Sequence, residues 1–386
     1  MNVTMVCDVL GKENNGTTVA AMNLYRSLTA KGHKVKIVCP DKDKEGMEGY
    51  FVVPTVNFGK ALNGYIAKNG VTIAKCDEGI LRKALEGSDV VHIMIPFSLG
   101  RHAVRLAHEM GIPVTAGFHA QAENLSSHVF LKNSKLASKI IYKNFYDHFY
   151  KYVDAVHYPT EFIRDVFESS VKHKTNAYVI SNGVNKRFVR REVNKPEELK
   201  DKFVILFTGR YSKEKSHKVL IDAVKKSKYE KNIQLIFAGA GPMENKLKKY
   251  ASKHLTNMPQ FKFFGREEMV DCINYSDLYV HPAEIEIEAI ACLEAIACGL
   301  VPVIANSPRC ATKAFALDEK NLFKNKDSAD LCKKIEYWIE HPEEKKRRSQ
   351  EYLGFATEFD QDVCMDNMEK MLIDVIKANK EKVKTN

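Results

Sequence analysis

The residues best suited to chemistry lie in the second half of the chain, where two cations follow a strand-like apolar run. This run, 203–208, leads into Arg210 and, five positions later, Lys215. An arginine fork beside a lysine point charge suits a diphosphate. The alternative is a solvated basic pair on a loop, so the interpretation depends on what surrounds these cations.

Two glutamates form the next candidate region, 283–299. Glu286 precedes an apolar helical pattern that ends at Gly299, and Glu294 lies eight positions later, within that pattern. Carboxylates near a helix start accept hydrogen bonds from sugar and ribose hydroxyls, while the free amides of the first turn favour a phosphate. Ordinary surface glutamates on a capped helix are the alternative. Because an unpaired charge among the apolar neighbours of Glu294 is costly, the pattern favours a binding role.

Short β-rich runs alternate with helical patterns along the whole chain, and these elements must position the cations and carboxylates. Such alternation predicts parallel sheets covered by helices on both faces. Ligands of these sheets bind at the carboxyl ends of the strands, so the residues that follow the strands are the ones expected to act. We predict an α/β protein with two doubly wound, Rossmann-like domains that face a cleft.

The boundary between the domains is predicted at an Asn-Gly turn, 182–183, which a charged, proline-containing stretch follows. The predicted first domain covers residues 1–183, and the second covers 184–354. A C-terminal helix, 355–386, is expected to cross back to the first domain.

The composition excludes several classes of protein. With 386 residues, 45% hydrophobic and 28% charged, the chain is typical of globular proteins and too long for one ordinary core. It has no run of about 18 apolar residues, and its N-terminus lacks the layout of a signal peptide, so we expect a cytoplasmic protein. Nine cysteines without a Cys-x-x-Cys pair indicate buried thiols rather than a zinc site. The net charge of +10 favours anionic partners such as nucleic acid, nucleotide phosphates or an anionic membrane.

Taken in chain order, the motifs resemble those of the retaining glycosyltransferases of family 4, which have the GT-B fold. In the second half the resemblance is carried by Thr208-Gly209-Arg210 with Lys215, Gly239-Ala240-Gly241-Pro242, Phe264-Gly265-Arg266, the spacing of Glu286 and Glu294, and Glu-Ala-Ile-Ala-Cys-Gly at 294–299. In the first half it is carried by Asn15-Gly16-Thr17, Gly32-His33 and Ser181-Asn182-Gly183-Val184. It spans nearly the whole chain, and the segments 118–124 and 284–288 extend it to bacterial diacylglycerol glucosyltransferase-like members.

The resemblance implies transfer of a hexosyl group from a nucleotide sugar, held by the second domain, to an acceptor on the side of the first. It assigns catalysis to His119, Arg210, Lys215 and Glu286. The two cations neutralise the departing diphosphate, Glu286 contacts hydroxyls of the transferred sugar, and His119 lies near that sugar. No metal and no cofactor other than the donor are implied. UDP-glucose is the favoured donor, ahead of UDP-galactose and GDP-mannose.

The resemblance also implies a set of donor-binding residues. These are Gly16, Arg210, Lys215, Gly241, Gly265, Glu286, Ala289, Ile290 and Glu294. Within this set Glu294 binds the ribose hydroxyls, and Gly16 lets the backbone approach the phosphate or the acceptor closely.

The chain departs from the family pattern at two places. Ile287-Glu288-Ala289 stands where many relatives have Gly-Phe-Gly, and the loop 11–16 is less glycine-rich than usual. The first departure bears on the sugar pocket and the second on contacts to the acceptor. Asp41-Lys42-Asp43 has the form of the Asp-x-Asp motif of metal-using glycosyltransferases, but it follows the second strand, so we interpret it as a solvated turn.

A predicted basic helix, 131–153, bears on the acceptor. It has an apolar stripe formed by Leu136, Ile140, Phe145 and Phe149. Its basic face carries Lys132, Lys135, Lys139 and Lys143. Such a helix either rests on an anionic bilayer or is a domain helix with solvated lysines. We expect a lipid acceptor such as diacylglycerol and a peripheral position on the inner face of the cell membrane, with a saccharide intermediate of surface polysaccharide synthesis as the alternative acceptor.

Two other classes compete with this interpretation. An NAD-dependent oxidoreductase is indicated by Gly239-Ala240-Gly241 after a strand, but the third glycine of the dinucleotide fingerprint is missing. A nucleic-acid-binding protein is indicated by the net charge. However, the lysines are scattered and no recognised module is present, so no nucleic-acid partner is expected.

Overall fold

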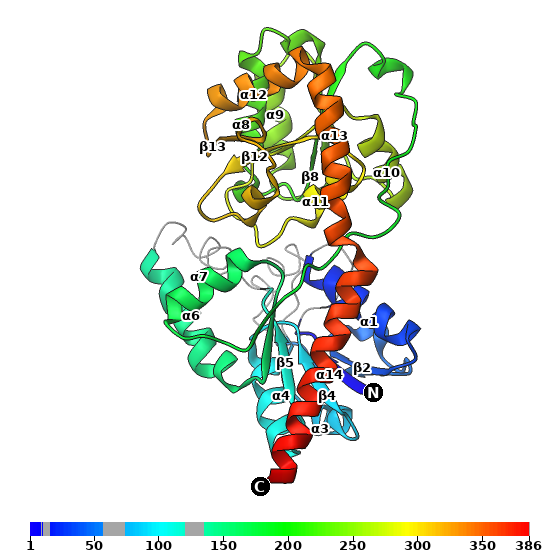
Figure 1. Ribbon diagram of the computed structural model, residues 1–386, viewed down its shortest axis with the longest axis vertical. Helices are drawn as coiled ribbons and strands as arrows, with labels where there is room; N and C mark the ends of the chain where they lie inside the picture. Colours follow the sequence, from blue (N-terminus) through cyan, green and yellow to red (C-terminus); the bar gives the residue numbers. More distant parts are fainter. Residues whose placement is uncertain (9, 11–15, 57–73, 120–134, 386) are drawn as a thin grey trace. The chain divides into compact units, whose positions relative to one another are not determined.

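The computed structural model describes residues 1–385 apart from 9, 11–15, 57–73 and 120–134. It divides into two compact units (Figure 1): unit 1 comprises Met1–Asn182 and Asp362–Asn386, and unit 2 comprises Gly183–Gln361. From the sequence, we predicted that the first domain ends at residue 183 and that the chain crosses back to it from residue 355. The chain instead stays in unit 2 as far as Gln361, because Phe355 and Phe359 pack against the core of that unit.

Unit 1 contains a sheet of seven parallel strands in the order β3-β2-β1-β4-β5-β6-β7. The strands are β1 (Asn2–Val6), β2 (Lys34–Cys39), β3 (Tyr50–Val52), β4 (Val90–Ile93), β5 (Val114–Gly117), β6 (Ala155–Tyr158) and β7 (Ala177–Val179). Every residue of β4, β5 and β6 is buried, as expected for strands covered on both faces. The strand order reverses between β1 and β4, which is the position where doubly wound sheets bind ligands.

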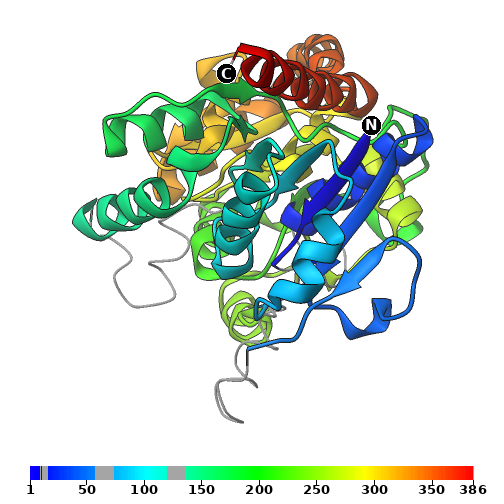
Figure 2. The ribbon, with the colours of Figure 1, turned by 90° about the horizontal axis from the view of Figure 1, so that it is seen from below.

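Helices cover both faces of this sheet. They include α1 (Gly16–Ala30), α3 (Glu78–Leu85), α4 (Ser98–Glu109), α6 (Lys135–His148), α7 (Glu161–Val171) and α14 (Gln361–Thr385). Leu24 of α1 and Met368 of α14 belong to one core with residues of β1 and β2. Ion pairs join α3 and α4, with Arg82 and Glu109 2.9 Å apart. Figure 2 shows α14 and the pair α3–α4 on opposite sides of the sheet.

The helix α6 differs from the predicted one. It covers Lys135–His148 rather than 131–153, and Lys132 lies outside the described residues. The prediction of one apolar stripe is wrong, because Phe145 is buried whereas Leu136 and Ile140 are 68% and 60% exposed. An α-helix has about 3.6 residues per turn, so residues nine positions apart lie on opposite sides. Leu136 and Phe145 therefore cannot share a face.

Unit 2 contains a second parallel sheet, of six strands, in the order β10-β9-β8-β11-β12-β13. The strands are β8 (Phe203–Thr208), β9 (Ile233–Ala238), β10 (Gln260–Lys262), β11 (Leu278–His281), β12 (Pro302–Asn306) and β13 (Leu322–Lys324). Its helices are α8 (His217–Lys226), α9 (Glu244–His254), α10 (Arg266–Tyr275), α11 (Ile290–Ala297), α12 (Ser328–Glu340) and α13 (Pro342–Ala356). The order reverses between β8 and β11, so this sheet has the same kind of switch point as the first. Both sheets confirm the predicted doubly wound α/β architecture.

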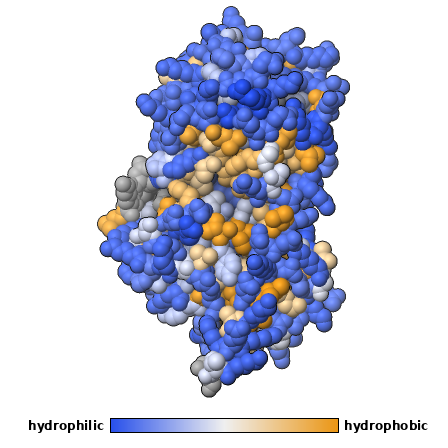
Figure 3. Space-filling view, viewed as in Figure 1, coloured by the Kyte–Doolittle hydropathy of each residue, from blue (hydrophilic) through white to orange (hydrophobic). Residues whose placement is uncertain are grey.

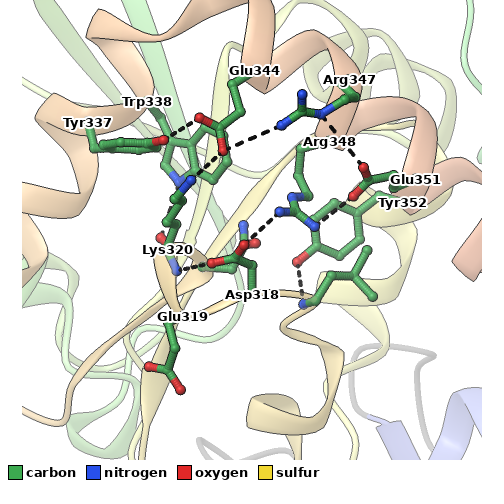
Figure 4. Close-up of polar contacts among 12 residues, drawn as sticks. Asp318, Glu319, Lys320, Tyr337, Trp338, Glu344, Arg347, Arg348, Glu351 and Tyr352 are labelled. Carbon is green, nitrogen blue, oxygen red and sulfur yellow. Dashed lines mark hydrogen bonds and ion pairs between the residues drawn. The ribbon is translucent and has the colours of Figure 1, made fainter.

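A polar network holds α13 against α12 and the loop before β13 (Figure 4). Glu344 accepts from Lys320 at 2.7 Å and from the hydroxyl of Tyr337. Arg348 donates to Asp318 at 2.8 Å. Figure 3 shows hydrophilic side chains over most of the surface of unit 2 on the face seen in Figure 1.

Within the described part of the chain, none of the helices is both long enough and apolar enough to cross a membrane.

Candidate functional site

The switch point of unit 2 gathers the strongest sequence-predicted residues. Arg210 and Lys215 lie on the loop after β8, and Glu286 lies on the loop after β11, the neighbouring strand. The parallel pairing of β8 with β11 places both loops at the same edge of the sheet. Arg210 is exposed. Lys215 and Glu286 are brought into direct contact.

Lys215 and Glu286 form a shielded ion pair. The Lys215 ammonium donates to Oε1 of Glu286, and the two side chains are only 17% and 15% exposed. Nε2 of His281, the last residue of β11, lies 3.4 Å from the same oxygen. Burial acts to raise the pKa of Glu286, but the charge of Lys215 and the proximity of His281 outweigh it and lower the pKa to about 2. Glu286 is therefore ionised at neutral pH and has a fixed position.

Two residues that the sequence prediction missed complete this region. His281 is buried at the end of an apolar strand, and burial lowers its pKa, so its ring is a neutral partner for Glu286. Glu284 accepts from Ser216 at 3.2 Å and pairs with Arg309 at 3.0 Å. It thereby ties the loops after β8, β11 and β12 together. The sequence signal for His281 is a histidine at the end of an apolar strand.

The glycines after β9 have a packing role. A Cβ on Gly239 would lie 2.1 Å from the carbonyl oxygen of Gly209, and one on Gly241 would lie 2.7 Å from the backbone nitrogen of Tyr211. The loops after β8 and β9 therefore touch along their backbones, and Tyr211 N donates to Ala240 O at 3.0 Å. This contact supplies a structural reason for Gly241 that requires no ligand.

Gly265 lies at the start of α10, after β10. Its amide donates to the carboxylate of Glu268 at 3.0 Å, which caps the helix. Like Gly241, it follows a strand of unit 2 and has a local structural role.

The backbone at the start of α11 shows the cost of one departure from the family pattern. Ala289 precedes Ile290, the first residue of α11, and has φ 66° and ψ 64°. Glycine adopts this left-handed conformation freely, whereas a residue with a Cβ does so at a cost of roughly 1–2 kcal/mol. The glycine that many relatives have here thus fits the backbone better than the alanine of this chain.

Glu294, in the second turn of α11, is a half-buried carboxyl without a protein partner. It makes no hydrogen bond or ion pair with any residue that the structure describes. Burial raises its pKa to about 8, and the charge of Arg187 offsets this only in part. A carboxyl left unpaired at the edge of a core is typical of a group that awaits a ligand.

Unit 1 contains the remaining predicted residues, Gly16 and His119. Gly16 is the first residue of α1, and a Cβ there would meet no described atom within 4 Å, so its predicted close approach to a ligand stays a prediction. The rest of its loop, 11–15, lies outside the described residues. His119 follows β5, and its imidazole folds back over Gly117, where a Cβ would lie 2.5 Å from Nε2.

His119 is one of three enclosed histidines near the carboxyl ends of β4, β5 and β6. Its ring centroid is 5.6 Å from that of His157, and His92 lies on β4. Burial lowers the pKa of each, to about 3 for His92 and about 4 for His157, so all three rings are neutral. Each has one ring nitrogen with no hydrogen-bond partner among the described residues. Sequence reasoning missed His92 and His157, whose signal is a histidine within an apolar strand.

Asp8, directly after β1, is a further buried group that the sequence prediction missed. Its carboxylate accepts from the amides of Leu99 and Gly100, at 3.3 and 3.2 Å, at the start of α4. Burial raises its pKa to about 7, although these two hydrogen bonds act to lower it. Asp8 therefore bridges β1 and the helix that follows β4 across the switch point of unit 1.

The predicted solvated turn at Asp41-Lys42-Asp43 is a single helical turn, with Asp43 75% exposed. Over the described ranges, no three histidine, cysteine, aspartate or glutamate side chains are grouped so as to hold a metal ion. All nine cysteines are free, and eight are buried.

Matches to two known families identify the chain as a glycosyltransferase. The family described as "Glycosyltransferase Family 4" matches residues 14–188, and "Glycosyl transferases group 1" matches 188–352. The chain therefore belongs to glycosyltransferase family 4, and its two parallel-sheet units are those of the GT-B fold.

Known proteins agree with this assignment. The chain is similar to the α-monoglucosyldiacylglycerol synthase of Streptococcus pneumoniae, with 28% identity over 79% of this chain and 71% of the relative. It is 27% identical to the enzyme of the same name from Acholeplasma laidlawii, over 96% of both chains. Among solved structures, HepE of Anabaena in complex with UDP is 15% identical, with a TM-score of 0.74 over 97% of this chain and all of that one. This last likeness concerns the fold alone.

Proposed function

We propose that this glycosyltransferase transfers glucose, with retention of configuration and without a metal, from UDP-glucose to a diacylglycerol-type lipid at a membrane surface. The observation that carries the proposal is the charge arrangement at the switch point of unit 2. There Lys215 is held by ionised Glu286, and Glu294 has no protein partner. The names of the two synthases support a glucosyl group and a diacylglycerol acceptor.

The site residues would act mainly through electrostatics. As the bond from the sugar C1 to the diphosphate breaks, negative charge grows on the departing phosphate, and Arg210 with Lys215 would stabilise it. The new bond forms between C1 and the oxygen of the acceptor hydroxyl, and the proton of that hydroxyl passes to the departing UDP. Glu286 would accept hydrogen bonds from sugar hydroxyls, because it stays ionised. Glu294 would receive the ribose hydroxyls, which supply the hydrogen bonds that it lacks.

Binding of the donor would rearrange the existing ion pair. Without a ligand, the charge of Lys215 is largely neutralised by Glu286. A diphosphate carries more charge than one carboxylate, so it would draw Lys215 away and free Glu286 for the sugar. The same two residues would thus serve the diphosphate and the sugar of the donor.

The outer face of α6 supports the membrane part of the proposal. Leu136 and Ile140 are one turn apart and strongly exposed, and exposed Lys139 and Lys143 lie beside them. A pair of exposed aliphatic side chains flanked by lysines is typical of a helix that lies in the interface of an anionic bilayer. Serine at both aliphatic positions should abolish flotation with anionic vesicles. Unchanged flotation of this double variant would contradict the membrane assignment while leaving the enzyme assignment intact.

The experiment that tests the activity measures transfer of labelled glucose from UDP-glucose to diacylglycerol in mixed anionic vesicles. Unlabelled UDP-galactose and GDP-mannose should compete weakly, and EDTA should have no effect. The anomeric proton signal of the product reports whether configuration is retained. Transfer to a saccharide, but not to the lipid, would show that the acceptor is a saccharide and contradict the lipid assignment. Failure of every nucleotide sugar to react or bind would contradict the donor assignment.

A further inference from the structure

A second candidate site lies in unit 2, at the amino ends of the strands. A cavity of about 340 Å³ is formed there by the segments before β11 and β12, the N-terminal half of α13 and the segment 190–195. The donor site lies at the opposite, carboxyl ends of the same strands. The two sites therefore share the sheet but no lining residues.

The lining of this cavity is strongly basic. Its charged residues are Arg190, Arg191, Lys195, Lys345 and Lys346, with Asp277 as the single carboxylate. Ordinary surface charge mixes both signs, so five cations against one anion in a concave site is unusual. A cavity of this volume matches the lower end of the range for small-ligand pockets, about 300–1,000 Å³.

Only two of the five cations have a carboxylate partner. Lys195 pairs with Asp277 at 2.5 Å, and Arg191 pairs with Asp271 at 2.7 Å. The other three form no ion pair within the described part of the chain. Lys345 lies over the ring of Phe203 at 4.5 Å, and burial lowers its pKa although the charge of Asp277 acts to raise it.

Arg190 is held in position by contacts that do not neutralise its charge. Its guanidinium donates to the hydroxyl of Ser349 at 2.6 Å, and that hydroxyl donates to the carbonyl of Gly299. A Cβ on Gly299 would lie 2.8 Å from the same guanidinium, so the glycine makes room for it. A cation positioned by a hydroxyl and a glycine, instead of by a carboxylate, keeps its charge available.

Two of the acidic residues of α13 are held away from the cavity. Glu344 and Glu351 of this helix belong to the network on its other side, with Lys320 and Arg348 (Figure 4). Lys345, Lys346 and Ser349 line the cavity. Glu344 and Glu351 are thus held in the network by other cations, whereas Lys345 and Lys346 line the cavity without a carboxylate from this helix as an ion-pair partner in the described part of the chain.

We propose that this cavity binds a phosphate-bearing anion. An arginine fork and two lysine point charges around a small concave site match the charge and the several acceptor oxygens of a phosphate group. A free phosphate and the headgroup of an anionic phospholipid share this chemistry. This site is independent of the proposed donor and acceptor.

Calorimetric titration of the full chain tests the site. An Arg210→Ala/Lys215→Ala background removes both cations of the proposed donor site. The probes are inorganic phosphate and, separately, dihexanoyl phosphatidylglycerol kept below its critical micelle concentration. We expect saturable binding that is about tenfold or more weaker in Arg190→Gln/Lys345→Gln, which removes two charged donors. The matched control Lys246→Gln/Lys249→Gln removes two exposed lysines of α9 and should bind like the parent.

The two probes separate the sources of the phosphate. Binding of inorganic phosphate identifies a site for free phosphate groups, and binding of the lipid alone identifies a headgroup site. If neither probe binds saturably, or if the cavity and control variants bind equally, the proposal is overturned. Lys346→Gln, at an exposed position, keeps the test valid should the double variant fold poorly, and a few-fold loss is expected from it.

Discussion

In unit 2 the loops after β8 and β11 hold charged groups in pairs, whereas the strands β4 to β6 of unit 1 end in uncharged ones. Lys215 and Glu286 are both ionised and fix each other's position. His119 and His157 are both neutral, because burial lowers the pKa of each ring. The two edges have the same switch-point topology, so the difference lies in the side chains and not in the fold.

Under the proposed function, this difference would correspond to a division of tasks. Fixed charges stabilise charge that develops on a ligand, which is what the departure of a diphosphate requires. Neutral rings with a free nitrogen can accept or donate a hydrogen bond without attracting a counter-ion. Such rings suit a sugar or an acceptor hydroxyl better than a phosphate. This difference can be tested by substitutions that alter only the charged groups of unit 2 or only the neutral histidines of unit 1.

The largest effect is expected from Lys215→Ala, which removes the shielded cation of unit 2. Loss of one preorganised group that stabilises developing charge lowers kcat by about 100–1,000-fold. Initial rates with UDP-glucose measure this. Lys213→Ala is the matched control, because Lys213 belongs to the same helical turn but is exposed, and its rate should stay near that of the parent chain. Equal losses in the two variants would show that general surface charge, and not the pair with Glu286, matters.

Gly117→Ala tests the histidines of unit 1. The new Cβ would fall 2.5 Å from Nε2 of His119, so the ring must move. A shift of about 1 Å near the reacting groups lowers the rate by up to about 100-fold, and overpacking of the buried site lowers the free energy of unfolding by about 1–3 kcal/mol. Rates and urea unfolding curves, compared with the Gly79→Ala control on α3, separate the two effects. A stability loss without any change in rate would argue against a role of His119 in the reaction.

Glu294→Gln sharpens the comparison, because Glu294 is the carboxyl of the unit 2 site that has no counter-charge. Its pKa in the folded chain, about 8, lies above the ordinary value of 4.5, so its contribution to stability is fully present below about pH 4.5 and is lost as the pH rises through 8. The variant should therefore match the parent chain at pH 5 and be more stable at pH 9, by roughly 1–3 kcal/mol for a partly solvated group. Unfolding followed through Trp338, the single tryptophan and a core residue of unit 2, measures this. Parallel stability curves across this pH range would contradict the raised pKa.

Much of the architecture was predictable because buried parallel strands are apolar along their whole length. The strands β8, β9, β11 and β12 have this pattern, and they carry the residues of the site. Two strands, β3 and β13, were not predicted. Each has three residues at the edge of its sheet and is partly exposed, so its formation depends on pairing with a neighbour and not on a local pattern.

The site was predictable only where neighbours in sequence carry the chemistry. Lys215, Glu286 and Glu294 follow from a motif and its spacing. The pairing of Lys215 with Glu286, and of His119 with His157, depends on which strands become neighbours, which no local spacing encodes. The basic cavity joins segments more than 150 residues apart in sequence, such as those of Arg190 and Lys345. Contacts of this kind belong to the topology and become visible only with the fold.

The smallest effect is expected from Ala289→Gly, which restores a residue that many relatives carry at the start of α11. Because φ is 66° at this position, glycine should relieve the left-handed strain and raise the free energy of unfolding of unit 2 by about 0.5–1 kcal/mol. Ala297→Gly at the last position of the same helix is the control, and it should lower stability by about 0.5–1 kcal/mol because the backbone there is helical. Opposite signs for one chemical change on one helix would establish that backbone conformation decides the result. If both variants lost stability, Ala289 would be held by its packing, and the departure from the relatives would reflect the shape of the sugar pocket rather than tolerated strain.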